Sequence, residues 1–136
     1  MIDVSDIFFD QFQNTKPLIA LKEAIAANED KILDLNRQQL DRGQDSQGRS
    51  LGRYANFKYK NRFEPVDLKL TGDFRNKFSL QIDDKQTEIF SQDVKEEKLK
   101  KRYGKEIFGI SNTYLPNMQG LIEDDFVKHY QQQLLK

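Results

Sequence analysis

The segment Lys69-Leu70-Thr71-Gly72-Asp73-Phe74-Arg75-Asn76-Lys77-Phe78 lies at the middle of the chain and decides how its two halves are joined. Residues 66–70, which lead into this segment and include its first two residues, alternate apolar and polar side chains, which is typical of a half-buried strand or an extended approach. Thr71 is a natural helix cap and predicts a short helix that carries Phe74 and Phe78 on one face. We therefore expect a structural joint made of Leu70, Thr71, Gly72, Phe74 and Phe78.

Upstream of this joint, residues 17–40 have the pattern of one long helix. Thr15 is a candidate cap, Pro17 suits the first helical turn, and Gly43 ends the helix. At 1.5 Å per residue this helix would be roughly 36 Å long, about the diameter of a domain of this size. Spacings of three and four place one stripe on one face, consisting of Leu18, Leu21, Ile25, Asn28, Ile32, Leu35 and Gln39.

Downstream of the joint, residues 79–82 and 87–91 are typical of two short antiparallel strands, with Asp83-Asp84-Lys85 as their turn. Asp93 then predicts the start of a short charged helix. In that helix Val94 and Leu99 are expected inward, and Gly104 ends it.

The last part of the chain begins with a brief apolar run, Ile107-Phe108-Gly109-Ile110, which indicates a strand or a docking loop. From Tyr114 the pattern becomes helical again, and Pro116 suits an early turn. The stripe of this closing helix consists of Leu121, Ile122, Phe126, Tyr130 and Leu134.

Length and element order predict a single α+β domain over residues 1–136. The expected architecture is a long N-terminal helix and a C-terminal helix packed on a small antiparallel sheet, with a protruding basic aromatic loop. Residues 1–15 contain the apolar side chains of Ile7, Phe8, Phe9 and Phe12 and form a possible docking arm. Residues 41–65 are expected to be a loop or arm, because they begin with a glycine-rich turn segment.

Residues 49–63 are the most biased stretch of the chain, with interleaved basic and aromatic residues and no acidic one. Such a segment suits a single-stranded nucleic-acid groove, because rings stack on bases while Lys and Arg contact phosphates. It also suits an arm laid across an acidic neighbour in an oligomer, or a solvated loop with a few rings directed inward. The candidate surface consists of Arg49, Arg53, Tyr54, Phe57, Lys58, Tyr59, Lys60 and Arg62.

Residues able to perform chemistry are scarce. The chain has no cysteine, which excludes disulfides, thiolate metal sites and cysteine nucleophiles. Its only histidine is His129, and no phosphate-binding glycine motif or nucleophile elbow occurs. We therefore expect a non-enzymatic protein with no catalytic residue, no metal ligand and no cofactor. No signal-peptide pattern and no run of about 18 apolar residues occurs, so no membrane association is expected.

Three blocks of the sequence resemble a known group of proteins. The first block is Leu35-Asn36-Arg37-Gln38-Gln39-Leu40, followed by Gly43, Asp45, Gly48, Leu51-Gly52 and Tyr54. The second is Val66-Asp67-Leu68-Lys69-Leu70-Thr71-Gly72-Asp73-Phe74, followed by Phe78 and strands. The third is Lys101-Arg102-Tyr103-Gly104 with Ile107-Phe108-Gly109-Ile110 and a closing helix. In this order, over most of residues 33–112, they resemble the small neck and tail-completion proteins of tailed bacteriophages, including the virion-morphogenesis group.

The resemblance implies a virion structural protein that forms a ring adaptor at the head–tail neck or at the tail-completion position. Its partners would be copies of itself and other phage neck, portal and tail proteins. DNA would pass through the channel without sequence-specific binding. The protein would be made in the bacterial host cytoplasm and kept in the virion. Glu123-Asp124-Asp125 and the basic aromatic segment fit this expectation, because opposite charges on one chain favour the head-to-tail contacts that close rings.

Two other functions stay open from the residues alone. A small single-stranded nucleic-acid-binding module would use residues 49–63 and would show a steep dependence of binding on salt. A regulatory protein that binds one host factor is compatible with the same sequence.

Overall fold

The structure, a computed structural model, describes residues 15–53, 66–69, 72–83 and 87–135. Its α+β architecture confirms the predicted fold class, with five helices, one 3-10 turn and a two-stranded antiparallel sheet in the described residues. The elements are α2 (Thr15–Ala27), α3 (Glu29–Asp41), α4 (Asp73–Asn76), β1 (Phe78–Ile82), β2 (Thr87–Ser91), α5 (Glu96–Tyr103), η2 (Lys105–Ile107) and α6 (Leu115–Leu134).

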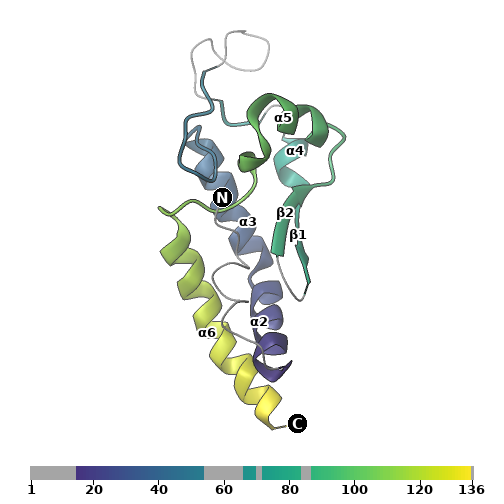
Figure 1. Cartoon of the computed structure of the whole chain (residues 1–136), viewed down its shortest axis with the longest axis vertical. Coiled ribbons are helices and arrows are strands. Elements are labelled where there is room, and N and C mark those ends of the chain that lie inside the picture. The colour runs from purple at the N-terminus through teal and green to yellow at the C-terminus, as the bar shows by residue number, and fades with distance from the viewer. Residues whose placement is uncertain (1–14, 54–65, 70–71, 84–86, 136) are drawn as a thin grey trace.

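The molecule is elongated, with two ends of different construction (Figure 1). At one end, which we call the helical end, α2 and α6 lie side by side and run in opposite directions. At the other, the aromatic end, α4 and α5 lie above the strands. Helix α3 continues from α2 toward the aromatic end and joins the two. The N- and C-terminal helices therefore pack on each other, and the small sheet contacts α3.

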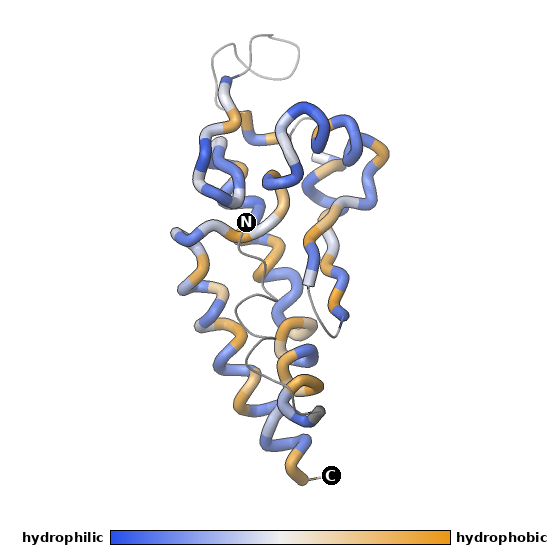
Figure 2. Tube along the Cα trace, in the orientation of Figure 1, coloured by the Kyte–Doolittle hydropathy of each residue, from blue (hydrophilic) through white to orange (hydrophobic). Residues whose placement is uncertain are grey.

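The helical end is held together by an apolar cluster between α2, α3, α6 and the segment that leads into α6, which we call the helical core. Apolar residues recur along both α2 and α6, as Figure 2 shows. This spacing places an apolar stripe of each helix against the other, and it explains why each forms a helix here. The buried members are Leu21, Ala24, Ile25, Ile32, Leu35, Ile110, Tyr114, Met118 and Ile122.

The prediction of one helix over residues 17–40 is wrong, because the helix is interrupted at Asn28. Asn28 has a ψ of 16°, and its N–H donates to the Ile25 carbonyl at 3.1 Å, one residue closer than in an α-helix. Its buried side-chain amide donates to the carbonyl oxygens of Ala24 (2.9 Å) and Leu121 (3.3 Å). It also donates to Asp125 Oδ2 at 2.7 Å. An asparagine side chain that bonds nearby carbonyls competes with the backbone hydrogen bonds of a helix. Asn28, predicted to lie on the stripe of one long helix, therefore lies at a break between two helices and bonds to α6.

The end of α3 is set by Gly43, as expected. Gly43 has a φ of 70°, a left-handed conformation that glycine adopts without the steric penalty of a Cβ. Its N–H donates to the Leu40 carbonyl at 2.8 Å, and the Gln44 N–H donates to the Gln39 carbonyl at 3.2 Å. This pair of bonds is the Schellman arrangement, which satisfies two carbonyls that the helix end leaves open.

The aromatic end is built around three phenylalanines, in a cluster we call the aromatic core. Phe74 and Phe78 meet edge to face with ring centroids 5.3 Å apart, and Phe108 lies 5.8 Å and 5.4 Å from them. Edge-to-face rings stabilise a core beyond the area they bury. The buried members are Leu33, Leu40, Val66, Leu68, Phe74, Phe78, Leu99, Ile107 and Phe108.

The central joint differs from its prediction in two ways. Residues 66–69 form no strand: Val66, Asp67 and Leu68 are all buried, and Leu68 is left-handed with a φ of 57°. The alternating pattern did not predict this structure, because the chain turns here and successive side chains face the same core. Leu70 and Thr71 lie outside the described residues, and Gly72 occupies the cap position of α4. The short helix ends before Phe78, which begins β1.

The two strands pair as predicted, with Phe78 opposite Ser91 and Ile82 opposite Thr87. Two side chains anchor this hairpin to the rest of the molecule. Ser91 Oγ donates to the Phe74 carbonyl at 2.8 Å, and Glu29 Oε1 accepts from the Leu80 N–H at 3.2 Å. Arg75 links the joint to α3, since its guanidinium lies 2.6 Å from Asp41 Oδ1.

The segment 107–111 is a docking loop and not a strand, which decides between the two alternatives for this run. Two buried amides of α3 hold it. Asn36 donates to the Ile107 carbonyl at 3.0 Å and accepts from the Gly109 N–H at 3.0 Å. Gln39 donates to the Gly109 carbonyl at 3.2 Å and accepts from the Ser111 N–H at 2.8 Å. The side chains of Asn36 and Gln39 thus form the hydrogen bonds with the backbone of this loop that a neighbouring strand would otherwise form.

Two apolar residues are placed differently from expectation. Val94, expected inward, is 95% exposed, because α5 begins only at Glu96 and Val94 lies in the turn before it. Leu134, expected on the stripe of the closing helix, is also exposed. The prediction that Leu99 is buried and that Gly104 ends the helix is confirmed.

Candidate functional site

The turn segment after α3 is organised by one buried carboxylate. Asp45 Oδ1 accepts from the N–H groups of Gln47 and Arg49, both at 2.9 Å, and the Asp45 N–H donates to the Arg49 carbonyl. The loop therefore closes on itself around Asp45. Since both contacts use Asp45 Oδ1 within the loop, this carboxylate serves local structure, and no prediction from the sequence had assigned it that role.

Arg49 joins this loop to η2. Its guanidinium lies 3.3 Å from Asp45 Oδ2 and 4.0 Å from Glu106 Oε2, while the Ser46 N–H donates to the Glu106 carbonyl. The Arg49 side chain is 61% exposed, so it remains reachable from solvent. Two carboxylates beside it offset much of its charge, which makes Arg49 a weaker anion contact than its place in the sequence suggests.

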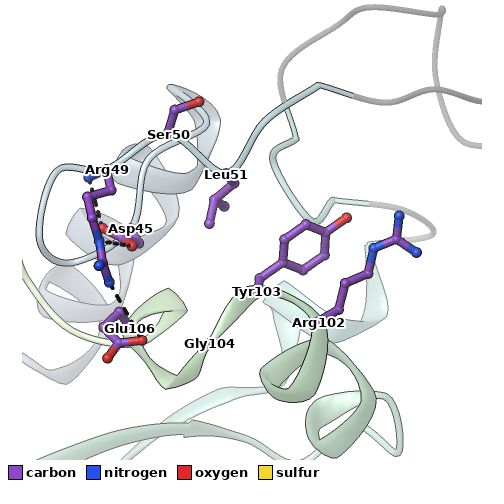
Figure 3. Close-up of a pocket in the computed structure, with 8 residues that line it drawn as sticks. All are labelled: Asp45, Arg49, Ser50, Leu51, Arg102, Tyr103, Gly104 and Glu106. Atoms are coloured by element: carbon purple, nitrogen blue, oxygen red, sulfur yellow. Dashed lines mark hydrogen bonds and ion pairs between the residues drawn. The ribbon is translucent and has the colours of Figure 1, made fainter.

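Beside Arg49 lies a depression of 460 Å³ between the turn segment and the end of α5. Figure 3 shows the side chains of Leu51 and Tyr103 on facing sides of it, with Arg102 extending from α5 next to Tyr103. The Arg102 guanidinium lies 5.5 Å from the centre of the Tyr103 ring. The full lining is Asp45, Arg49, Ser50, Leu51, Arg102, Tyr103, Gly104 and Glu106.

Of the predicted interaction surface, the structure describes only Arg49 and Arg53, and both are exposed. The remaining members lie outside the described residues: Tyr54, Phe57, Lys58, Tyr59, Lys60 and Arg62. Of the predicted joint, Phe74 and Phe78 are members of the aromatic core and Gly72 precedes α4. These three residues have a structural role and add nothing to a binding surface.

The structure reveals a second basic surface, the α5 basic face, made of Lys98, Lys101, Arg102 and Lys105. All four are exposed, and none has a carboxylate within 4 Å in the part of the chain that the structure describes. By contrast, Lys100 on another side of α5 lies 3.6 Å from Glu97. The spacing i, i+3, i+4 of the first three cations was the available signal. The α5 basic face was not predicted, because residues 93–103 were interpreted only as a charged helix.

A third surface is the α6 outer face, made of Gly120, Glu123, Asp124 and Val127. These positions follow one another at helical spacing on the exposed side of α6, opposite the helical core. Among described residues neither Glu123 nor Asp124 has an ion-pair partner, whereas Asp125 accepts the bond from Asn28. Val127 is 54% exposed.

His129 is a contact between helices. Its Nδ1 lies 2.9 Å from Glu23 Oε2, and Gln133 Nε2 donates to Glu23 Oε1 at 2.8 Å. These contacts tie α6 to α2 at the helical end. The described residues contain no group of three or more side chains suited to bind a metal ion. Within the same residues no helix is long and apolar enough to cross a membrane.

No family model matches the chain, and no curated protein and no solved structure matches it significantly.

Proposed function

We propose that this chain is a non-enzymatic structural protein of a tailed phage, an oligomeric ring adaptor at the head–tail neck or the tail-completion position. The proposal combines the resemblance of the three sequence blocks with the surfaces described above. Its working contacts are between copies of the chain and with neck, portal or tail proteins. DNA passes through the ring without being read.

The observation that carries the proposal is the way the three blocks meet. Leu40 from the first block, Phe74 from the second and Phe108 from the third are buried in the same aromatic core. The clamp of Asn36 and Gln39 on residues 107–111 joins the first block directly to the third. Residues of the three blocks, far apart in sequence, therefore form one packed unit of this chain, and the proposed likeness to the phage proteins rests on this unit.

Unpaired surfaces support an assembly role. The α5 basic face and the α6 outer face carry opposite charges that find no partner among the described residues of the same chain. Protein surfaces that work by association hold such complementary charges, which select the partner and speed its approach.

The test is whether the protein assembles and where it resides. Sedimentation velocity and negative-stain electron microscopy of the purified chain should show a symmetric ring. Immunogold labelling of intact particles should mark the junction between head and tail. A chain that is monomeric at every concentration and absent from particles would contradict the proposal.

A second candidate is a single-stranded nucleic-acid-binding module. It is favoured by the α5 basic face, whose Arg102 lies against the Tyr103 ring beside the depression. Stacking rings and cations along one groove are the usual means of binding single strands. Titration with fluorescent oligonucleotides at several salt concentrations tests it, because each phosphate contact steepens the dependence of affinity on salt. Absence of binding at low salt would remove this candidate.

A further inference from the structure

We infer that copies of this chain bind head to tail, with the α6 outer face of one copy on the α5 basic face of the next. The inference rests on the proposed oligomeric function and names the two surfaces that meet. The occupant of each face is a second copy of this chain. Every copy uses one face of each kind, so the contact repeats from copy to copy.

The first support is the helix position of Gly120. A glycine in a helix interior costs about 1 kcal/mol relative to alanine, so it usually has a reason. Gly120 has no positive φ, and a Cβ built on it would meet no heavy atom within 4 Å. Nothing among the described residues of the monomer therefore requires glycine. A close approach by another chain does supply a reason, because the missing side chain lets a partner reach the helix surface.

The second support is that exposed residues with no ion-pair partner among the described residues lie near Gly120 on α6. Glu123 and Asp124 follow Gly120 by one turn, and the exposed Val127 by two turns. This side of α6 therefore carries a small residue, an acidic pair and an exposed apolar side chain. Such a surface has both negative charge and an apolar group that can pack against a partner. Such a combination is typical of a contact with a core of apolar packing and a charged rim.

The third support is complementarity with the α5 basic face. Its four cations repel one another in the monomer, so an acidic neighbour would lower the energy of this face. The depression between Leu51 and Tyr103 opens beside Arg102, one of these cations (Figure 3). The acidic pair of the α6 outer face can thus meet Arg102 and Lys98, while Val127 lies about one turn farther along α6.

The contact must form between copies. No ion pair joins the α5 basic face to the α6 outer face within the described residues of one chain. Figure 1 shows α5 at the aromatic end and α6 along the helical end. A contact between two different surfaces is heterologous, and it closes into a ring when the rotation between copies divides a full turn. This is the geometry that a ring adaptor needs.

Charge reversal tests the inference on the full chain. One protein carries Glu123→Lys with Asp124→Lys, and a second carries Lys98→Glu with Arg102→Glu. In the first both faces are basic, and in the second the α5 face loses its net positive charge while the α6 outer face stays acidic, so each should self-associate at least about tenfold more weakly than the native chain. An equimolar mixture should restore association, because the reversed charges at positions 123 and 124 of one protein then face the reversed charges at positions 98 and 102 of the other. Sedimentation velocity measures all three.

The matched control is Asp30→Lys with Asp34→Lys, which changes the same number of charges on exposed positions of α3. It should leave association unchanged. Circular dichroism should show that all variants remain folded. Carbodiimide cross-linking of mixed isotope-labelled and unlabelled copies adds a direct readout, since it should join Glu123 or Asp124 of one copy to Lys98 or Lys101 of another.

The outcomes separate this inference from the proposed function. If the native chain forms rings but the reversed proteins do so equally well, or the mixture fails to restore them, the inference is overturned and the adaptor function stands. If the Lys98 and Arg102 variant loses oligonucleotide binding while association persists, the face belongs to nucleic acid. A native chain that is monomeric and absent from particles overturns both. Loss of thermal stability in monomeric Glu123 and Asp124 variants would assign the α6 outer face to an intramolecular contact.

Discussion

The two ends of the molecule are stabilised by different means. The helical end consists of two antiparallel helices, α2 and α6, that pack through apolar stripes. One polar residue, Asn28, lies at the break between α2 and α3 and bonds to α6. The aromatic end contains little regular structure, and its three phenylalanines and two amides hold turns and a hairpin in place. Both ends use contacts between residues far apart in sequence, 71 positions for Asn36 and Ile107 and 97 for Asn28 and Asp125. At the helical end, however, the helices satisfy most of their own backbone hydrogen bonds, whereas the turns of the aromatic end need side chains to hold them. We therefore expect mutations of single residues to cost more at the aromatic end.

The largest effect should come from Phe74→Ala. Phe74 is fully buried and contacts both other rings of the aromatic core. Its removal leaves a cavity, and the free energy of unfolding should fall by about 3–5 kcal/mol. Urea unfolding followed by circular dichroism measures the change. Val94→Ala is the control, because this exposed side chain should contribute less than about 0.5 kcal/mol. Equal losses for the two variants would contradict the assignment of the aromatic core.

Gln39→Leu should be nearly as damaging, although the replacement is apolar and of similar size. It leaves the Gly109 carbonyl and the Ser111 N–H without their partners, each worth about 1–3 kcal/mol when buried. We expect a total loss of about 2–4 kcal/mol in urea unfolding. Gln38→Leu is the neighbouring control, because Gln38 is exposed and should tolerate the change. If Gln39→Leu is neutral, the amides do not hold the docking loop.

Asn28→Ala should have a moderate effect at the helical end. It removes the hydrogen bond to the Asp125 carboxylate, which is worth about 1.5–3 kcal/mol. The bond to Asp125 is only partly buried, so solvent that replaces it offsets part of the loss. A net loss of about 1–2 kcal/mol is expected. Thermal unfolding beside Lys31→Ala, an exposed control on α3, measures it. A loss as large as that of Phe74→Ala would remove the difference between the ends.

Gly120→Ala should have the smallest effect, and of the opposite sign. Because no atom lies near the added Cβ, the monomer should gain about 0.5–1 kcal/mol from helix propensity. The same methyl group lies on the α6 outer face, so self-association should weaken. Thermal unfolding and sedimentation velocity on one sample separate the two results. A monomer that loses stability would show that an intramolecular contact occupies this position.

Regular elements were the part of the fold that sequence patterns predicted well. The strands and the closing helix were found within a few residues, and so were the helix ends at Gly43 and Gly104. These features depend on neighbours in sequence, on helical or strand periodicity and on glycine conformation. The break at Asn28 was not predicted, since two of the partners of its side chain, Leu121 and Asp125, lie 93 and 97 positions away.

The candidate site was predicted less well. Arg49 was singled out, but the loop closure by Asp45 and the neutralising contact with Glu106 need the folded chain. The α5 basic face contains cations that a sequence shows only as one charged run. Their lack of ion-pair partners within the described part of the chain becomes visible only when the distances to carboxylates are known. The basic aromatic residues 54–62 lie outside the described residues, and their role stays a prediction.

The sequence by itself determined the α+β class, the strands, the closing helix and most helix ends, because these follow from periodicity and local chain conformation. Only the tertiary structure decided that residues 66–69 turn into the core and that Asn36 and Gln39 act as a substitute strand for residues 107–111. The tertiary structure also decided which charged side chains have no ion-pair partner among the described residues. The physical reason is the same in each case: a buried polar group or a charge is defined by what lies next to it in space.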